Sequence, residues 1–268
     1  MVLMLAAGIL VGAVLGLTGA GGGILAVPAL MATQGWALPQ AAPVALLAVV
    51  AGAALGTYEG WRRRLVRYRA AILMAACGLP FAALGARAAH ILPASLLAGL
   101  FAAVMLIVAW RAWQGGGAKA ADSANMDAVC RINPDTGRLR WTAASAAALA
   151  GVGAFTGFLT GLLGVGGGFV IVPALRRLSD LSMHAIVATS LMGIMLVGGG
   201  SVLAAGWHGA KLPPLQTAGF VLATALGMAA GRWAIRRLSP PLVLRGFAVL
   251  VAAVAAAMLW HAGQAVLA

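Results

Sequence analysis

The chain has 268 residues, of which 63% are hydrophobic and only 9% are charged, and its mean hydropathy is +1.01. A soluble domain carries about 25% charged residues, so this composition excludes an ordinary soluble protein and predicts an integral membrane protein. The net charge of +13 comes from arginines between the apolar stretches, which is typical of topological anchoring; no basic face with aromatic or motif context indicates a nucleic-acid partner.

Apolar segments follow one another along the chain and predict an all-α polytopic membrane protein. They cover residues 3–17, 24–33, 42–59, 70–86, 93–113, 143–163, 169–175, 184–206, 214–231 and 241–265. Segments of about 18 or more apolar residues are candidate membrane spans, whereas 24–33 and 169–175 are too short to cross at about 1.5 Å of rise per residue. The start of the chain lacks a basic region, so we expect it to be a mature segment and not a cleaved signal.

A glycine-rich motif occurs twice, and each copy interrupts an apolar segment. The first copy runs from Gly16 to Leu30 and the second from Gly161 to Leu175, with ten of fifteen positions identical at a constant offset of 145 residues. Such a run of glycines breaks a helix, and broken helices at membrane depth line protected cavities rather than lipid. Breaks at corresponding positions of two halves indicate a transporter's binding site.

The longest polar stretch, residues 114–140, predicts a cytoplasmic linker between a first transmembrane repeat at 1–113 and a second at 141–268. Each repeat then has a glycine-broken helical element and three transmembrane helices. If the broken elements are re-entrant, the repeats are inverted and the 18 Lys and Arg residues divide 16 to 2 between the two sides; if every arm crosses, they divide 11 to 7. The positive-inside rule favours inverted repeats with both termini outside, although first arms of about 24 Å are long for re-entrant helices.

The glycine turns are the predicted substrate site. Glycine lets backbone approach a ligand closely, and the N-terminus of the short helix after each turn offers unpaired N–H groups and about half a positive charge, which suits an anion. The predicted substrate-binding residues here are Thr18, Gly21, Gly22, Gly23, Gly166, Gly167 and Gly168. The alternative role for glycine is close helix packing, which we expect for scattered pairs such as Gly227 and Gly231.

A few polar residues are further candidates for functional roles, because the apolar segments contain few polar side chains. Thr189 and Ser190 are adjacent hydroxyls inside the first full span of the second half; such hydroxyls either bond back to their helix or face a pocket, and both alternatives stay open. Glu59 is predicted to form an interfacial ion pair, with a proton-relay or gating role as the alternative. His184 is the histidine best placed for titration.

The sequence lacks the residues that a metal site, a catalytic dyad or a phosphate-binding loop would need. Cys77 and Cys130 have no metal-ligand spacing to other Cys or His residues, so we expect no metal and no cofactor. Ser190 and His184 are six positions apart on roughly opposite helix faces, so a catalytic dyad is excluded and the chain is not expected to be an enzyme. The glycine motif also lacks the Gly-Lys-Ser/Thr of a phosphate-binding loop.

The two copies of Gly-x-x-Gly-x-Gly-Gly-Gly, each followed by Val-Pro-Ala-Leu, resemble the sulfite exporter TauE/SafE family, as do His184-Ala185 and Thr189-Ser190-Leu191 behind the second copy. The resemblance covers both halves. It implies a multi-pass permease or exporter of the bacterial inner membrane for small anions, often sulfite or small organosulfur anions. It also implies that Gly21–Gly23, Gly166–Gly168, Thr189 and Ser190 lie near the substrate.

Two alternatives to this function stay open. A transporter of another small solute could use the same scaffold, and a non-transporting membrane scaffold subunit would use the glycines for packing alone. The expected partners are a small anionic substrate and the lipid bilayer. The oligomeric state is not determined by the sequence, and a homodimer is compatible with it.

Overall fold

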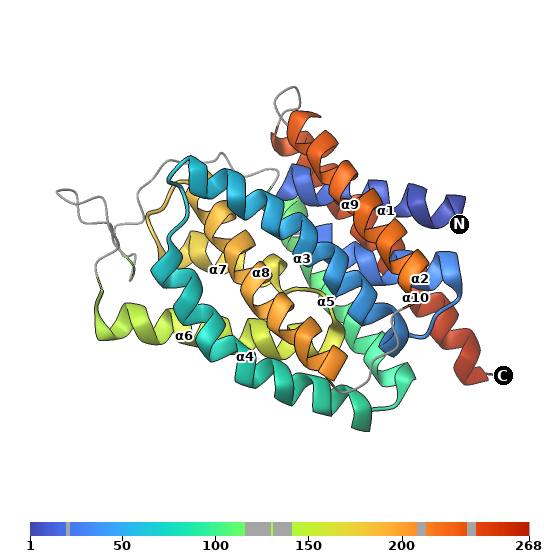
Figure 1. Ribbon diagram of the computed structural model, residues 1–268. Coiled ribbons are helices and arrows are strands. Elements are labelled where there is room, and N and C mark those ends of the chain that lie inside the picture. Colours follow the sequence, from blue (N-terminus) through green and yellow to red (C-terminus); the bar gives the residue numbers. More distant parts are fainter. Residues whose placement is uncertain (20–21, 116–129, 131–140, 208–212, 235–239, 268) are drawn as a thin grey trace.

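A computed structural model of the chain describes residues 1–19, 22–115, 130, 141–207, 213–234 and 240–267. Its elements in the first half are α1 (Val2–Thr18), the 3-10 helix η1 (Gly22–Leu25), α2 (Ala26–Gln34), α3 (Leu38–Arg62), α4 (Tyr68–Ile91) and α5 (Ala94–Gly115). Those in the second half are α6 (Ala143–Leu163), α7 (Gly168–Leu178), α8 (Met183–Trp207), α9 (Pro214–Ala234) and α10 (Pro240–Leu267). The predicted all-α class is confirmed for the described residues (Figure 1).

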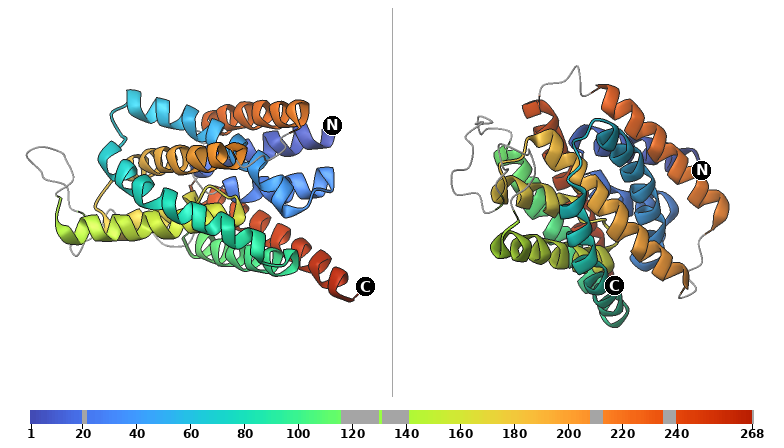
Figure 2. Two further views of the ribbon diagram at one scale, coloured as in Figure 1. Left: turned by 60° about the horizontal axis from the view of Figure 1, so that its bottom comes forward. Right: turned by 60° about the vertical axis from the view of Figure 1, so that its left-hand side comes forward.

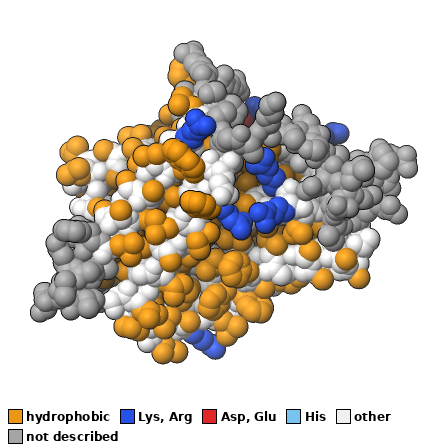
Figure 3. Space-filling view, turned by 180° about the vertical axis from the view of Figure 1, so that it is seen from behind, with side chains coloured by type: hydrophobic (Ala, Val, Ile, Leu, Met, Phe, Trp, Pro, Cys, Tyr) orange, Lys and Arg blue, Asp and Glu red, His pale blue; other side chains and the backbone are white. Residues whose placement is uncertain are grey.

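Seven of the described helices are long and apolar enough to cross a membrane: α3, α4, α5, α6, α8, α9 and α10. Their outward side chains are largely apolar. In Figure 3 hydrophobic side chains cover most of the visible face, and Lys and Arg gather in a few patches. An apolar surface of this extent is stable in a bilayer and not in water. The multi-pass membrane protein predicted from composition is therefore confirmed.

The two halves have matching helices. α3 and α8 begin and end at positions 145 residues apart, which is the offset of the glycine motif. Contacts between helices also match in pairs: α1 packs on α9 as α6 packs on α4, and α3 packs on α9 as α8 packs on α4. α3 packs on its own equivalent α8, and α5 packs on α10. This is the contact pattern of an internal two-fold axis, although the limits of the two repeats stay a prediction.

The equivalent helices α3 and α8 run antiparallel. A Cβ atom placed on Gly60 would lie 2.7 Å from Ala188 Cβ, whereas one on Gly198 would lie 2.7 Å from Val50 Cγ2. Residue numbers therefore increase along α3 in the direction in which they decrease along α8. Figures 1 and 2 show the two helices side by side. Antiparallel equivalents are what inverted repeats require, and the orientation of the repeats in a bilayer stays a prediction.

Each broken element is a hairpin. α1 runs parallel to α9, because Gly8 contacts Ala223 and Gly16 contacts Arg232. α9 in turn runs parallel to α3. Since α1 and α3 point the same way, the segment with η1 and α2 must return the chain to the end where α1 began. The same reasoning applies to α7, because α6 and α8 both run parallel to α4.

The two ends of the bundle differ in charge. One end, which we call the arginine end, has Arg62, Arg63, Arg64, Arg67, Arg69, Arg111, Arg176, Arg177, Arg232 and Arg245 at or near its helix ends, and the other, the terminus end, has Arg87 among the described residues. Figure 1 shows both chain termini at the terminus end and the end of α5 with the start of α6 at the opposite end. The described arginines are therefore divided between the two ends as the re-entrant arrangement requires, which is the arrangement that the positive-inside rule favoured.

Cys130 belongs to the predicted linker and is buried against the arginine end of the bundle. Its N–H donates a hydrogen bond of 2.8 Å to the Leu178 carbonyl at the end of α7, and its side chain joins a buried apolar cluster with Met74 and Leu175. Burial raises the pKa of the Cys130 thiol, and the Asp180 carboxylate raises it further. A thiol with a raised pKa is a poor nucleophile at neutral pH.

Two helix pairs pack backbone against backbone. A Cβ atom on Gly157 of α6 would overlap the Gly78 carbonyl oxygen of α4, and one on Gly227 of α9 would overlap the Ile9 carbonyl oxygen of α1. Helices in lipid gain no hydrophobic energy by associating, so close contact across small residues supplies their attraction. The expected packing role of the scattered glycines is confirmed, and each pair joins one helix from each half.

Replacement of Gly157 by Ala tests this packing. Because the added methyl group has no space, we expect Gly157→Ala to lower the free energy of unfolding by about 1–3 kcal/mol. The matched control is Gly151→Ala in the same helix, where a Cβ meets nothing within 4 Å and better helix propensity adds up to about 1 kcal/mol. Thermal unfolding of the purified variants in detergent measures both. Equal stability of the two variants would contradict the backbone contact.

Candidate functional site

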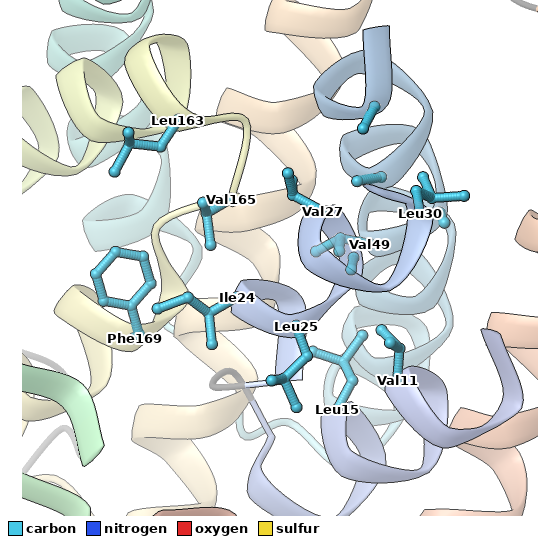
Figure 4. Packing of buried hydrophobic residues seen from close by; sticks show 14 of the residues in the cluster. Val11, Leu15, Ile24, Leu25, Val27, Leu30, Val49, Leu163, Val165 and Phe169 are labelled. Atoms are coloured by element: carbon cyan, nitrogen blue, oxygen red, sulfur yellow. The ribbon is translucent and has the colours of Figure 1, made fainter. Parts of the chain in front are cut away.

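The two glycine breaks contact each other inside the bundle. A Cβ atom on Gly23 would lie 3.0 Å from the Val165 carbonyl oxygen of the second break and 3.1 Å from Val49 Cγ1 of α3. Figure 4 shows Ile24 beside Val165 and Phe169, and all three side chains belong to one buried apolar cluster. The first break therefore forms one wall of the region around the second.

The second break turns the chain with glycines in the left-handed region. Gly164, Gly166 and Gly167 have φ angles of +70°, +74° and +61°, which L side chains rarely adopt. The Gly164 N–H closes α6 by donating to the Thr160 carbonyl at 2.8 Å. Gly167 is the N-cap residue of α7, and Gly168 is its first residue. These turns bring the start of α7 back into the bundle.

α7 begins in the protein interior without a side-chain cap. Gly168 is buried and Phe169 is 9% exposed, and the N-cap Gly167 has no side chain to accept from the first turn. α6 shows the contrast, because Thr142 and Ser145 form a reciprocal capping box at its start. The first N–H groups of a helix have no partner within the helix, so α7 directs donors and about half a positive charge into the bundle.

Two buried hydroxyls accompany this N-terminus. Thr156 is 1% exposed and Ser190 is 0% exposed, and neither Oγ atom has a hydrogen-bond partner in the described part of the chain. A Cβ atom on Gly167 would overlap Thr156 Cγ2, so Thr156 lies directly at the N-cap of α7. Ser190 is one turn from Ile194, whose Cγ2 would lie 3.2 Å from a Cβ on Gly166. A buried hydroxyl without a partner costs about 1–3 kcal/mol, which a polar ligand would remove.

A cavity of about 390 Å³ lies at the terminus end of the bundle, and its lining includes Gly164 at the start of the second break. Its walls come from the starts of α3 and α5 and the last turns of α4, α6 and α8. Two lining residues reach the second break: Thr160 Oγ1 would lie 3.0 Å from a Cβ on Gly167, and Leu46 Cδ1 would lie 3.7 Å from one on Gly166. The described lining includes His90 and Ser201 but no Asp, Glu, Lys or Arg.

The predicted residues of the first break have other contacts. The Thr18 hydroxyl donates to the Val14 carbonyl at 2.8 Å, and its side chain lines a separate apolar groove of about 190 Å³ between α1 and α10. Gly22 packs against α1, where a Cβ would overlap the Leu15 amide nitrogen. Gly21 lies outside the described residues. Of this set, Gly23 is the residue that contacts the second break.

The remaining predicted residues separate into different positions. Thr189 Oγ1 accepts a hydrogen bond of 3.0 Å from the Arg67 N–H, so this hydroxyl joins α8 to the residue before α4. His184 is exposed at the start of α8. Glu59 forms ion pairs of 2.7 Å with Arg63 and 2.6 Å with Arg232, as the sequence predicted for a carboxylate beside arginines. Thr189 therefore has a partner of its own, whereas Ser190, one turn from the Ile194 that contacts Gly166, has none in the described part of the chain.

Thr156 is not among the residues predicted from the sequence. It precedes the second motif by five positions, in an apolar segment whose equivalent residue in the first half is Val11. The sequence signal for Thr156 was that this position has a hydroxyl in the second half and a valine in the first. Only the return of α7 brings Thr156 to a helix N-terminus.

Metal ligands do not gather in the described part of the chain, where no group of three or more His, Cys, Asp and Glu side chains is placed to hold an ion. The site is instead a set of backbone N–H groups and hydroxyls beside a neutral-walled cavity. Together with seven apolar helices and two interrupted hairpins, this arrangement defines a multi-pass membrane protein of the transporter class.

Comparison with known proteins gives the family. The family model described as "Sulfite exporter TauE/SafE" matches residues 4–258, and the chain belongs to this family. It is 30% identical to a "Probable membrane transporter protein" of Xylella fastidiosa (strain 9a5c), over 74% of this chain and 71% of that protein. It is 26% identical to "Probable membrane transporter protein YunE" of Bacillus subtilis (strain 168), over 73% and 74%. No solved structure matches the chain.

The neighbouring hydroxyls Thr189 and Ser190 give a stability test of the site. Thr189→Val removes the acceptor of the Arg67 N–H and should lower the free energy of unfolding by about 1–3 kcal/mol. Ser190→Ala removes a hydroxyl that has no described partner, so it should leave stability unchanged or raise it slightly. Thermal unfolding in detergent without substrate measures both. A loss in Ser190→Ala equal to that in Thr189→Val would show that Ser190 holds the fold and is not available to a ligand.

Proposed function

We propose that the chain is a permease for small anions, with sulfite or small organosulfur anions as its substrates. The observation that carries the proposal is the buried, uncapped N-terminus of α7 beside the hydroxyls of Thr156 and Ser190. An anion accepts hydrogen bonds from N–H and O–H donors, and a helix N-terminus favours negative charge. The substrate-binding residues in this proposal are Gly166, Gly167, Gly168, Ser190 and Thr156.

Transport also requires that the anion leave the site. The described lining of the cavity has no cationic side chain, so the anion is held by dipoles and not by a full opposite charge. Binding that is favourable but weak enough to reverse suits conduction. An interior-negative potential favours the exit of an anion by about 2.3 kcal/mol per charge per 100 mV, so export can proceed without a coupled ion.

The family and the relatives support the same class. The family description names sulfite export, and the relatives are named as membrane transporters. These names support the proposal that the chain moves its substrate across the membrane.

The charge of the two ends supports a location. We place the chain in a bacterial-type inner membrane with the arginine end and the 114–140 linker in the cytoplasm and both termini outside, because basic residues gather on the cytoplasmic side. The described arginines at the arginine end carry this assignment.

Anion flux in proteoliposomes tests the function. With sulfite, sulfoacetate, thiosulfate, sulfate and acetate compared under a set membrane potential, we expect flux that is selective for a sulfur anion. Thr156→Val and Ser190→Ala should each raise the concentration for half-maximal flux by about ten-fold, because a hydrogen bond to a charged group contributes about 1.5–3 kcal/mol.

A matched control separates loss of the ligand contact from loss of a buried hydroxyl. Thr224 in α9 is 0% exposed, and its hydroxyl donates to the Phe220 carbonyl of its own helix at 2.8 Å. Thr224→Val should leave the half-maximal concentration unchanged. Absence of flux for all five anions in folded wild-type protein would reject the anion permease and favour another solute or a scaffold role.

Labelling of single cysteines in intact cells tests the location. In a background with Cys77→Ala and Cys130→Ala, His90→Cys at the terminus end should react with a membrane-impermeant thiol reagent, because His90 is exposed there. Gln114→Cys at the end of α5 should react only after the membrane is permeabilised. The reverse pattern would invert the proposed orientation.

A further inference from the structure

The cavity at the terminus end has an equivalent region at the arginine end, and that region is closed. Three residues of α8 that line the cavity are partly exposed: Ser201, Val202 and Ala205. Their equivalents on α3, 145 positions earlier, are all buried: Gly56, Thr57 and Gly60. The same helix surface is therefore open at one end of the bundle and covered at the other.

Side chains from the start of α8 cover the arginine end. Leu191 Cδ1 would lie 2.6 Å from a Cβ on Gly56, and Ala188 Cβ would lie 2.7 Å from one on Gly60. Val187 also packs against Gly19 at the end of α1, but its equivalent Ala42 packs against Gly164 in the same way, so this contact does not differ between the two ends. The equivalents of Leu191 and Ala188 are Leu46 and Pro43, and both line the open cavity.

An ion pair joins α3 to α9 at the closed end. Arg232 Nη1 lies 2.6 Å from Glu59 Oε2, and Arg63 on the same helix as Glu59 lies 2.7 Å from Oε1. At the terminus end the equivalent of Arg232 is Arg87, but the equivalent of Glu59 is Ala204, which has no carboxylate. The ion pair between helices can therefore form at the arginine end and has no counterpart at the other.

We propose that the Glu59–Arg232 ion pair is the gate of the permeation path at the arginine end, and that the structure is the state open to the terminus end. When the pair breaks, α3 is released from α9 and moves away from the start of α8 at the arginine end, while the cavity at the terminus end closes. Equivalent residues of the two halves then exchange environments, as an internal two-fold axis allows. The pairs α1/α9 and α4/α6 move as rigid units, because their backbones are in direct contact.

This inference rests on the proposed function for the existence of a permeation path, but its test does not measure flux. The readout is the reaction rate of a cysteine with a water-soluble methanethiosulfonate reagent in detergent-solubilised protein, where both ends are accessible. The background is Cys77→Ala with Cys130→Ala, and the two reporters are Ser201→Cys at the open end and Thr57→Cys at the closed end. Both replacements are close in size to the native side chains. When the Glu59–Arg232 ion pair is intact, Ser201→Cys should react faster than Thr57→Cys.

Glu59→Gln should change the two rates in opposite directions. Loss of a partly exposed ion pair shifts a two-state equilibrium by about two- to five-fold. The rate at Thr57→Cys should rise by about this factor, whereas the rate at Ser201→Cys should fall by less, because the state open to the terminus end predominates. Arg63→Gln is the matched control: it removes the ion pair within α3 and keeps the one to α9, so both rates should stay at their native values.

The outcomes discriminate between the proposals. A rise at both reporters in Glu59→Gln, or a rise at Thr57→Cys in Arg63→Gln, would mean local loosening and would overturn the gate, as would unchanged rates in Glu59→Gln. Reciprocal rates combined with no flux of any anion would retain the gate and reject the anion as the substrate.

Discussion

The interruption of two helices inside the bundle is the constraint on which the rest of this structure depends. A bilayer offers no hydrogen bonds, so broken backbone must lie within protein or beside a polar cavity. The second break meets this requirement partly by itself, since the Gly164 N–H finds the Thr160 carbonyl. At the start of α7 the Val170 and Ile171 N–H groups donate to the Gly167 carbonyl, and no side chain caps the helix. The proposed anion would supply the acceptor that this uncapped start lacks.

The helix contacts match between the two halves, but the polar groups do not. Three hydroxyls around the second break have apolar equivalents in the first half that are 0% exposed: Thr156 and Val11, Thr160 and Leu15, Ser190 and Ala45. The first break is therefore packed as core, and the second keeps the polar surface. Glu59 shows the opposite asymmetry, since its equivalent is Ala204. Duplication provides the symmetric framework, and substitution in one half or the other provides one site and one proposed gate.

Glycine has two separate roles in this chain. In α1/α9 and α4/α6 it lets helix backbones touch, which holds a helix from each half in a fixed position. In Gly164, Gly166 and Gly167 it supplies positive φ angles that turn α7 back into the bundle. The first role holds helices of the two halves together, and the second returns the N-terminus of α7 into the bundle, where we propose that it binds the anion.

The sequence alone determined the membrane class, the helices, the duplicated break and the family, because hydropathy, glycine runs and a constant offset are local properties of a chain. It also predicted a substrate site of Thr18, Gly21–Gly23, Gly166–Gly168, Thr189 and Ser190, which stays a prediction. It could not separate Ser190, which has no described partner, from Thr189, which accepts from Arg67, since adjacent residues of a helix face different neighbours. Nor could it find Thr156 or the closed arginine end. Those depend on which helices pack antiparallel and on where each hairpin returns, and only the tertiary structure decides that, because such contacts join residues far apart in the chain.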